Sequence, residues 1–181
     1  MLLYHTGYEI IQQPDIHYGR KNADFAQGFY LTPDRDFSVR WAKEKEGRLP
    51  IVNTYELDLS DLKVHRFERN EEWFSYIFQN RRGKTDTLEA DVIIGPIAND
   101  TIYDTLGIMT SGILSDEEAL SLLQLGPEYT QVALKTKKAA LHLSWIEAKE
   151  LTEAATVKNR DIILKEQEEY IAMIGQTMET F

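Results

Sequence analysis

The chain has 181 residues, of which 43% are hydrophobic and 28% are charged, as is typical of one globular domain with a sizeable core. Its 30 acidic and 20 basic residues give a net charge of -10, which excludes general coating of nucleic acid or anionic membranes. It contains no cysteine, so disulfides, thiolate metal sites and a cysteine nucleophile are excluded. The N-terminus does not resemble a signal peptide, and no apolar run approaches the roughly 20 residues of a membrane span, so we expect a cytoplasmic protein without membrane contact.

The first third of the chain predicts short strands and one long loop. Residues 2–5 and 8–12 are short apolar runs bounded by turn residues, and each predicts a strand. Residues 15–27 have neither a helical nor a strand period, and loops of about this length are usually functional or disordered. Residues 28–32 (GFYLT) predict a strand that is entered through a glycine.

A helix is expected next, from Pro33 to about Glu46, with Phe37, Trp41 and Val39 facing inward and Gly47 ending it. Four further elements follow: a strand at 51–59, a helix at 70–80 with Asn70 as its N-cap, a solvated turn at 81–87 containing Arg81, Arg82 and Lys84, and a strand at 90–94.

The remainder alternates between helices and strands. Asn99 or Asp100 is expected to cap a helix through Met109, although a direct role in a site stays open for both residues. Ser115 and Glu118 have the spacing of a capping box before a helix at 119–125. Three elements complete the domain: a strand at 130–135, a helix at 136–141 and a strand at 142–146.

Residues 156–181 predict a C-terminal amphipathic helix, with Ile163, Tyr170, Ile174 and Met178 on one stripe. There is no internal repeat and no long Pro, Gly or Ser linker. The sequence therefore predicts a single α+β domain over 1–181 that ends in this helix.

Familiar cofactor motifs are absent: the sequence has no GxGxxG, GxxxxGK[ST], HExxH or GxSxG. The four histidines are scattered, and none pairs with a carboxylate at ligand spacing, so we expect no metal site.

Three segments stand out instead: LYHTG around His5, DFAQGFYLT around Tyr30 and YTQVALKT around Gln131. Together with the longer runs HYGRKNADFAQGFYLT, VIIGPIANDTIY and QVALKTKKAALHL, they resemble the ADP-ribosyltransferase superfamily, and within it an uncharacterised bacterial family, a domain of unknown function. The resemblance covers residues 1–146.

This resemblance implies a split antiparallel β core with surrounding helices, in which a cleft between two small sheets binds NAD as a substrate. His5 would bond a ribose hydroxyl, Tyr30 would stack on nicotinamide, and Gln131 would stand where many transferases have a glutamate. Trp41 would be the second aromatic residue of the nicotinamide sandwich. The full set of expected cofactor-binding residues is Thr6, Gly7, Arg20, Phe29 and Trp41.

The residue types suit this chemistry. Cleavage of the nicotinamide glycosidic bond develops positive charge on the ribose, so the site needs a clamp for the flat leaving group and a fixed acceptor for a ribose hydroxyl. Gln131 can accept a hydrogen bond but cannot act as a base, and Gln131→Glu is expected to raise nicotinamide release. Glu128 is either an alternative carboxylate or a turn residue. Taken alone, without the resemblance, His5, Tyr30 and Trp41 are more typical of a core than of a site.

Arg20 and Lys21 are candidates for binding the pyrophosphate of NAD or are an exposed solubilising pair. Asp24 either holds their loop or is an ordinary turn residue.

The resemblance thus implies an NAD-dependent mono-ADP-ribosyltransferase, with NAD glycohydrolase side activity and an unknown macromolecular acceptor. It is expected to be a toxin or effector beside a small cognate antitoxin protein. The alternatives are a noncatalytic module that binds NAD or ADP-ribose and a protein-interaction module.

Overall fold

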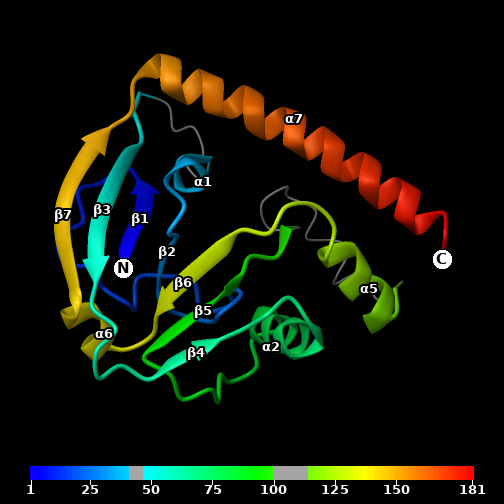
Figure 1. The fold of residues 1–181 in the computed structure, drawn as a ribbon, viewed down its shortest axis with the longest axis horizontal. Coiled ribbons are helices and arrows are strands. Elements are labelled where there is room, and N and C mark those ends of the chain that lie inside the picture. Colours follow the sequence, from blue (N-terminus) through cyan, green and yellow to red (C-terminus); the bar gives the residue numbers. More distant parts are fainter. Residues whose placement is uncertain (41–46, 100–113) are drawn as a thin grey trace.

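The computed structural model describes residues 1–40, 47–99 and 114–181, and it has an α+β architecture with two sheets and a long C-terminal helix (Figure 1). The strands are β1 (Leu2–Gly7), β2 (Phe29–Leu31), β3 (Ile51–Leu57), β4 (Val64–Arg66), β5 (Val92–Pro96), β6 (Thr130–Leu134) and β7 (Leu143–Glu150). The described helices are α1 (Arg35–Arg40), α2 (Glu71–Arg81), α5 (Asp116–Leu123), α6 (Lys137–Leu141) and α7 (Glu153–Met178). The α+β class and the C-terminal helix expected from the sequence are confirmed.

The two sheets are mostly antiparallel and meet at one pair of residues. The first sheet has the strand order β1-β3-β7, and the second has the order β2-β6-β5-β4, in which β4 and β5 run parallel. Tyr4 on β1 exchanges two backbone hydrogen bonds with Thr32, directly after β2, at 2.8 and 3.0 Å. The first strand of one sheet is thereby joined to the edge strand of the other.

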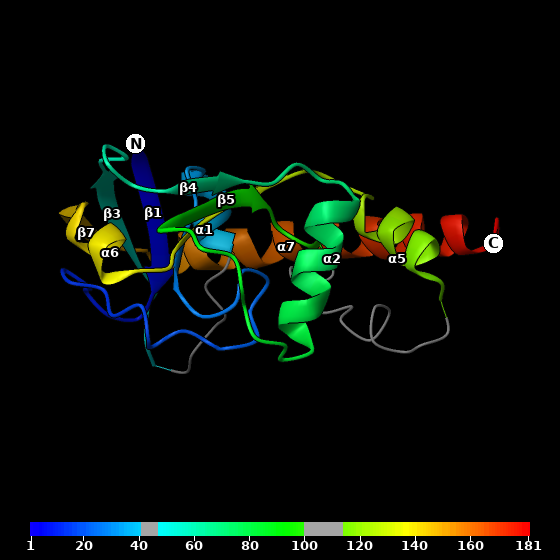
Figure 2. The ribbon, with the colours of Figure 1, turned by 90° about the horizontal axis from the view of Figure 1, so that it is seen from below.

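The central strands β5 and β6 of the four-stranded sheet are buried on both faces. One face contributes Phe29, Leu31, Val132 and Leu134 to a core shared with the three-stranded sheet. The opposite face packs on α2, which lies against the sheet in Figure 2. The side chains that α2 buries there are Trp73, Phe74 and Ile77. Burial on both faces explains why β5 reads as a continuous apolar run rather than an alternating one.

Helix starts follow the side chains that the sequence offers for capping. The Asn70 side chain accepts from the Trp73 amide at 3.1 Å at the start of α2. Ser115 and Glu118 form the expected capping box at the start of α5. Both predicted N-caps are therefore confirmed.

The strand expected at residues 8–12 is wrong. This segment is irregular because side chains of β3 hold its backbone groups. Asn53 accepts from the Ile11 amide and donates to the Glu9 carbonyl, both at 2.9 Å, and the Tyr55 hydroxyl donates to the Ile11 carbonyl at 2.6 Å. With these groups bonded, the segment does not enter a sheet.

Helix α7 begins at Glu153, earlier than expected, and runs from the end of β7 past α1 to α5 (Figure 1). Tyr170 and Ile174, two residues of the predicted stripe, are buried against Leu122 of α5. Met178 is 46% exposed, so its expected inward orientation is wrong. Eight residues after Tyr170, a side chain has rotated by about 80° around the helix, which takes it off the inward stripe.

No helix of the described ranges is both long and apolar enough to cross a bilayer. Trp41, with the rest of its predicted helix beyond Arg40, and the helix predicted from Asp100 to Met109 lie outside the described residues.

The docking of α7 can be tested with two neighbouring residues. Tyr170 is 1% exposed and Ile171 is 51% exposed. Tyr170→Ala is expected to lower the free energy of unfolding by about 3 kcal/mol because it leaves a cavity against α5. Ile171→Ala should change it by less than about 0.5 kcal/mol. Urea unfolding of both variants measures this, and equal losses would contradict the packing described.

Candidate functional site

Three strands bring His5, Tyr30 and Gln131 to the place where the sheets meet. His5 follows the Tyr4 junction residue on β1, and its ring reaches the Tyr30 backbone on β2. Tyr30 pairs with Ala133 on β6, and Gln131 lies two residues before Ala133, so Tyr30 and Gln131 share one face of the sheet. Together with Asp24, described below, these residues are called the junction site.

The His5 ring is held in one tautomer. Nδ1 lies 2.8 Å from the Tyr30 carbonyl oxygen, which can only accept, so Nδ1 carries the proton. Burial lowers the pKa of His5 from its usual 6.5, against the opposing effect of this hydrogen bond, so the ring is neutral near pH 7. Nε2 is therefore an acceptor. It lies beside Gly7, where an added Cβ would come within 3.5 Å of it.

The Tyr30 hydroxyl is fully engaged. It donates to the Ala26 carbonyl at 2.6 Å and accepts from the Phe25 amide at 3.0 Å. Burial and then the negative charge of Asp24 raise the pKa of Tyr30, while the Phe25 hydrogen bond and the positive charge of Arg20 lower it. The hydroxyl stays protonated near neutral pH, so Tyr30 does not supply a base.

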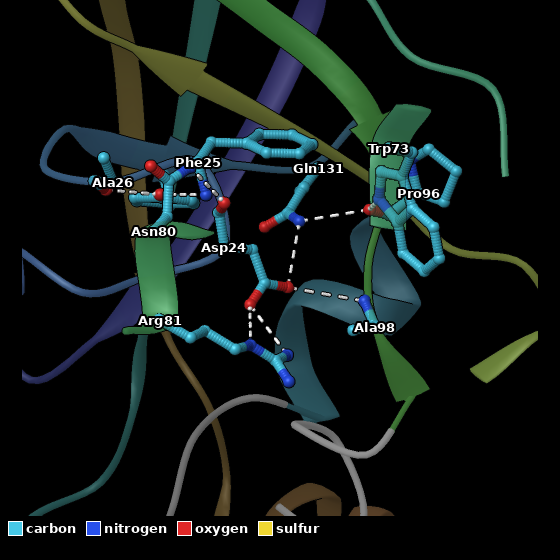
Figure 3. A network of polar contacts seen from close by, with 10 residues as sticks. Asp24, Phe25, Ala26, Trp73, Asn80, Arg81, Pro96, Ala98 and Gln131 are labelled. Atoms are coloured by element: carbon cyan, nitrogen blue, oxygen red, sulfur yellow. Dashed lines mark hydrogen bonds and ion pairs between the residues drawn. The ribbon is translucent and has the colours of Figure 1, made fainter. Parts of the chain in front are cut away.

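The Gln131 amide is oriented by two groups that can only accept. Its Nε2 donates to the Pro96 carbonyl at 3.2 Å and to Asp24 Oδ2 at 3.4 Å (Figure 3). Because neither partner could donate to a carbonyl, the nitrogen end must face them and Oε1 must face the other way. Among the described residues, the side-chain hydrogen bonds of Gln131 are those of its Nε2, and the residue is 3% exposed. Gln131 thus keeps one acceptor atom for a ligand.

Asp24 is the centre of a buried polar network that is visible in Figure 3. Its Oδ1 accepts from two nitrogens of Arg81 at 2.8 and 2.9 Å, and Oδ2 also accepts from the Ala98 amide at 3.4 Å. Asn80 donates to the Asp24 carbonyl at 2.9 Å. The Arg81 side chain is 9% exposed, so the expectation of a solvated turn is wrong for this residue. It holds for Arg82 and Lys84, which are exposed.

The structure thereby decides between the two interpretations of Asp24: it holds the loop. Its place in the site was missed by sequence reasoning, since the ion-pair partner is 57 residues away. The signal that could have drawn attention to Asp24 is its position next to the apolar run that leads into the Tyr30 strand.

Lys135 fixes the loop that carries Asp24. Its ammonium donates to the Phe25 carbonyl and, at 2.7 Å, to the Gln27 carbonyl, and it pairs with Asp86 at 3.2 Å. The loop then passes so close to β6 that a Cβ on Gly28 would lie 2.7 Å from the Leu134 carbonyl oxygen, so only glycine fits there.

The other expected cofactor-binding residues are spread around the junction site. Phe29 is a core residue, and its ring lies 4.7 Å from the His5 ring. Thr6 is buried and donates to the Ser38 hydroxyl at 3.2 Å. Arg20 is exposed, but close enough for its charge to act on Tyr30.

Burial lowers the pKa of Arg69, and the negative charge of Glu128, which is exposed, partly opposes this effect. Arg69 in turn donates to backbone carbonyls at and after the end of α5, among them those of Leu123 and Leu125 at 2.5 and 3.1 Å. No contact between Glu128 and Gln131 is present in the described part of the chain, so the structure gives the alternative carboxylate no support.

Two surface hollows lie elsewhere. One follows the first turns of α7, and the other is lined by residues around Met1, Asp58 and His142. Across residues 1–40, 47–99 and 114–181, no three histidine or acidic side chains are grouped as metal ligands would be.

The fold thus defines an α+β protein with a polar site at the meeting point of two mostly antiparallel sheets. Residues 1–145 match a family described as a protein of unknown function (DUF3990), and the chain belongs to this family. No curated protein and no solved structure matches the chain.

The buried state of His5 predicts a pH effect on stability. Because the folded protein has a lowered pKa at His5, the unfolded chain binds a proton that the folded chain does not as the pH falls below 6.5. Stability that is present above this pH is then lost. His5→Asn can still donate to the Tyr30 carbonyl, and it should lose less stability than the wild type between about pH 7.5 and about pH 5.5.

Chemical unfolding at the two pH values measures the difference. The control is His17→Asn, an exposed position that should leave the wild-type pH dependence unchanged. An unchanged dependence in His5→Asn would show that His5 is not responsible.

Proposed function

We propose that this protein is an NAD-dependent mono-ADP-ribosyltransferase that binds NAD at the junction site. The observation that carries the proposal is the pair of acceptor atoms, His5 Nε2 and Gln131 Oε1, on side chains whose opposite ends are fixed by hydrogen bonds to Tyr30, Pro96 and Asp24. Ribose hydroxyls are donors that suit both acceptors. The split arrangement of two sheets agrees with the resemblance to ADP-ribosyltransferases.

In the proposed reaction, the bond between the ribose C1′ and the nicotinamide nitrogen breaks, and its electron pair moves to that nitrogen. This neutralises the pyridinium charge and leaves positive character on the ribose. An acceptor nucleophile, or water in the glycohydrolase reaction, then bonds C1′ and releases a proton. Gln131 Oε1 would hold a ribose hydroxyl as charge develops, and His5 Nε2 would hold another.

Binding would be shared among aromatic and basic side chains. The Tyr30 ring would stack on the nicotinamide, with a cation–π contribution of about 0.5 to 2 kcal/mol before bond cleavage. Arg20 would contact the pyrophosphate. The acceptor would be a macromolecule, in keeping with an effector or toxin that is controlled by a small cognate partner protein.

The second candidate function is a noncatalytic module that binds NAD or ADP-ribose. The observation that favours it is the residue at position 131, because an amide is not a base. The Tyr30 hydroxyl, which stays protonated, does not replace it. Such a module would bind NAD but release no nicotinamide.

Binding at His5 Nε2 can be tested through Gly7. Gly7→Val would place methyl groups over this nitrogen and is expected to weaken NAD binding by at least about tenfold, while Gly7→Ala, whose Cβ makes only an ordinary contact, should have a smaller effect. Valine suits a strand, so folding should be retained. Tryptophan fluorescence titration with NAD measures affinity, and equal affinities for the three proteins would place NAD elsewhere.

Turnover can be tested through Gln131. Gln131→Ala should slow nicotinamide release by about a hundredfold, with a smaller effect on the KM for NAD, because the hydrogen bond strengthens as charge develops. The matched control is Gln176→Ala on the exposed side of α7, which should behave as the wild type. Release is followed by chromatography, and labelled NAD incubated with a proteome reports transfer to an acceptor.

The outcomes separate the candidates. NAD binding with nicotinamide release supports the transferase, and binding of NAD or ADP-ribose without release supports the noncatalytic module. The absence of NAD binding rejects the transferase, and the absence of binding of either ligand rejects both.

A further inference from the structure

We infer that Asp24 supplies the negative charge of the junction site and acts through Gln131 as a positioning residue. The inference rests on the proposed function. A family resemblance places an amide where many transferases have an acid, and the structure places a buried carboxylate directly against that amide, at 3.4 Å from its nitrogen.

The first step of the argument is geometric. The carboxylate arrives from a loop, 107 residues away from Gln131 in the chain, and it is only 7% exposed. A buried carboxylate needs compensation, and Arg81 provides it at Oδ1. Oδ2 is left for the Gln131 nitrogen and the Ala98 amide. The two oxygens therefore have separate partners: Oδ1 pairs with Arg81, and Oδ2 accepts from Gln131 and Ala98.

The second step is electronic. An amide whose N–H donates to an anion carries more negative charge on its oxygen, since hydrogen bonds in a chain polarise one another. The second N–H donates to the Pro96 carbonyl, so both protons point away from the ligand side. Gln131 Oε1 becomes a stronger acceptor than a free amide and is held in place. Asp24 makes and breaks no bond in this scheme and moves no proton.

The third step concerns the substitution Gln131→Glu, which the sequence alone expects to raise turnover. With Asp24 in place, this variant would set two carboxylates side by side, and they would repel each other. The added charge should help only when Asp24 loses its own. The structure thus reverses the expectation for the single variant.

The test compares three variants with the wild type in nicotinamide release. Asp24→Asn should lower kcat by at least about tenfold with little change in KM, the scale of one hydrogen bond to a charged group. The double variant Asp24→Asn/Gln131→Glu again has one carboxylate in the network, now at position 131. It should recover most of the loss in kcat. Gln131→Glu alone should be slower than the double variant.

The control for a structural role is Asp86→Asn. Asp86 forms the other ion pair that holds this loop, with Lys135, and among the described residues it makes no hydrogen bond with Gln131. If Asp24 only anchors the loop, the Asp86 and Asp24 variants should lose kcat alike and the double variant should recover nothing. Either result would overturn the inference.

A second readout is independent of activity and of any substitution that could prevent folding. In the wild-type protein, both Nε2 protons of Gln131 are bonded, so the NMR signals of its side-chain amide should exchange slowly with solvent. Fast exchange would overturn the inference. In folded Asp24→Asn, these signals should shift, whereas in Asp86→Asn they should not.

This readout also separates the two proposals. If the wild type neither binds NAD nor releases nicotinamide, the proposed function fails, and the amide signals still decide whether Asp24 orients Gln131. If NAD is turned over but the amide is unaffected by Asp24→Asn, the proposed function stands and this inference fails.

Discussion

The conformation of the short loop from Asp24 to Gln27 depends on buried side chains that donate hydrogen bonds to its backbone carbonyls. The position of Asp24 in the junction site depends in turn on this loop. Each of its four carbonyls is bonded by a side chain: Asp24 by Asn80, Phe25 and Gln27 by Lys135, and Ala26 by the Tyr30 hydroxyl. Ala26 has a φ of 56°, which costs about 1 kcal/mol for a residue with a Cβ. These bonds hold the loop in that conformation, which brings the Asp24 carboxylate to Gln131.

Local signals in the sequence were enough for elements whose stabilising groups lie within one turn. The cap at Asn70 and the capping box at Ser115 bond residues only three positions away, so the sequence carries the whole interaction. The predictions that were wrong concern residues whose partners lie far away in the chain. Residues 8–12 are kept out of a sheet by Asn53 and Tyr55, more than forty residues along the chain, and Arg81 is buried by a carboxylate that is 57 residues away.

The same distinction applies to the site. The resemblance named His5, Tyr30 and Gln131, and the structure brings these three residues to the junction of the sheets. It could not say which atoms would be left for a ligand. Which atoms are left depends on the hydrogen-bond partners of these side chains. The Tyr30 carbonyl binds Nδ1 of His5, and the Pro96 carbonyl and Asp24 bind Nε2 of Gln131, so the opposite end of each side chain is left for a ligand. Chemistry at such a site is decided by the partners of a residue as much as by its type.

The helix α7 begins after residue 145, where the match to the family ends, yet it braces the strand that carries Gln131. Glu166 accepts from Arg40 at 2.7 Å, and the same guanidinium nitrogen bonds the Tyr129 hydroxyl at 2.7 Å. Tyr129 stacks on Phe37 and lies two residues before Gln131. Helix α7 therefore supports the site from outside the residues that match the family, and a substitution at Glu166 would act on the start of β6 through the Arg40 guanidinium.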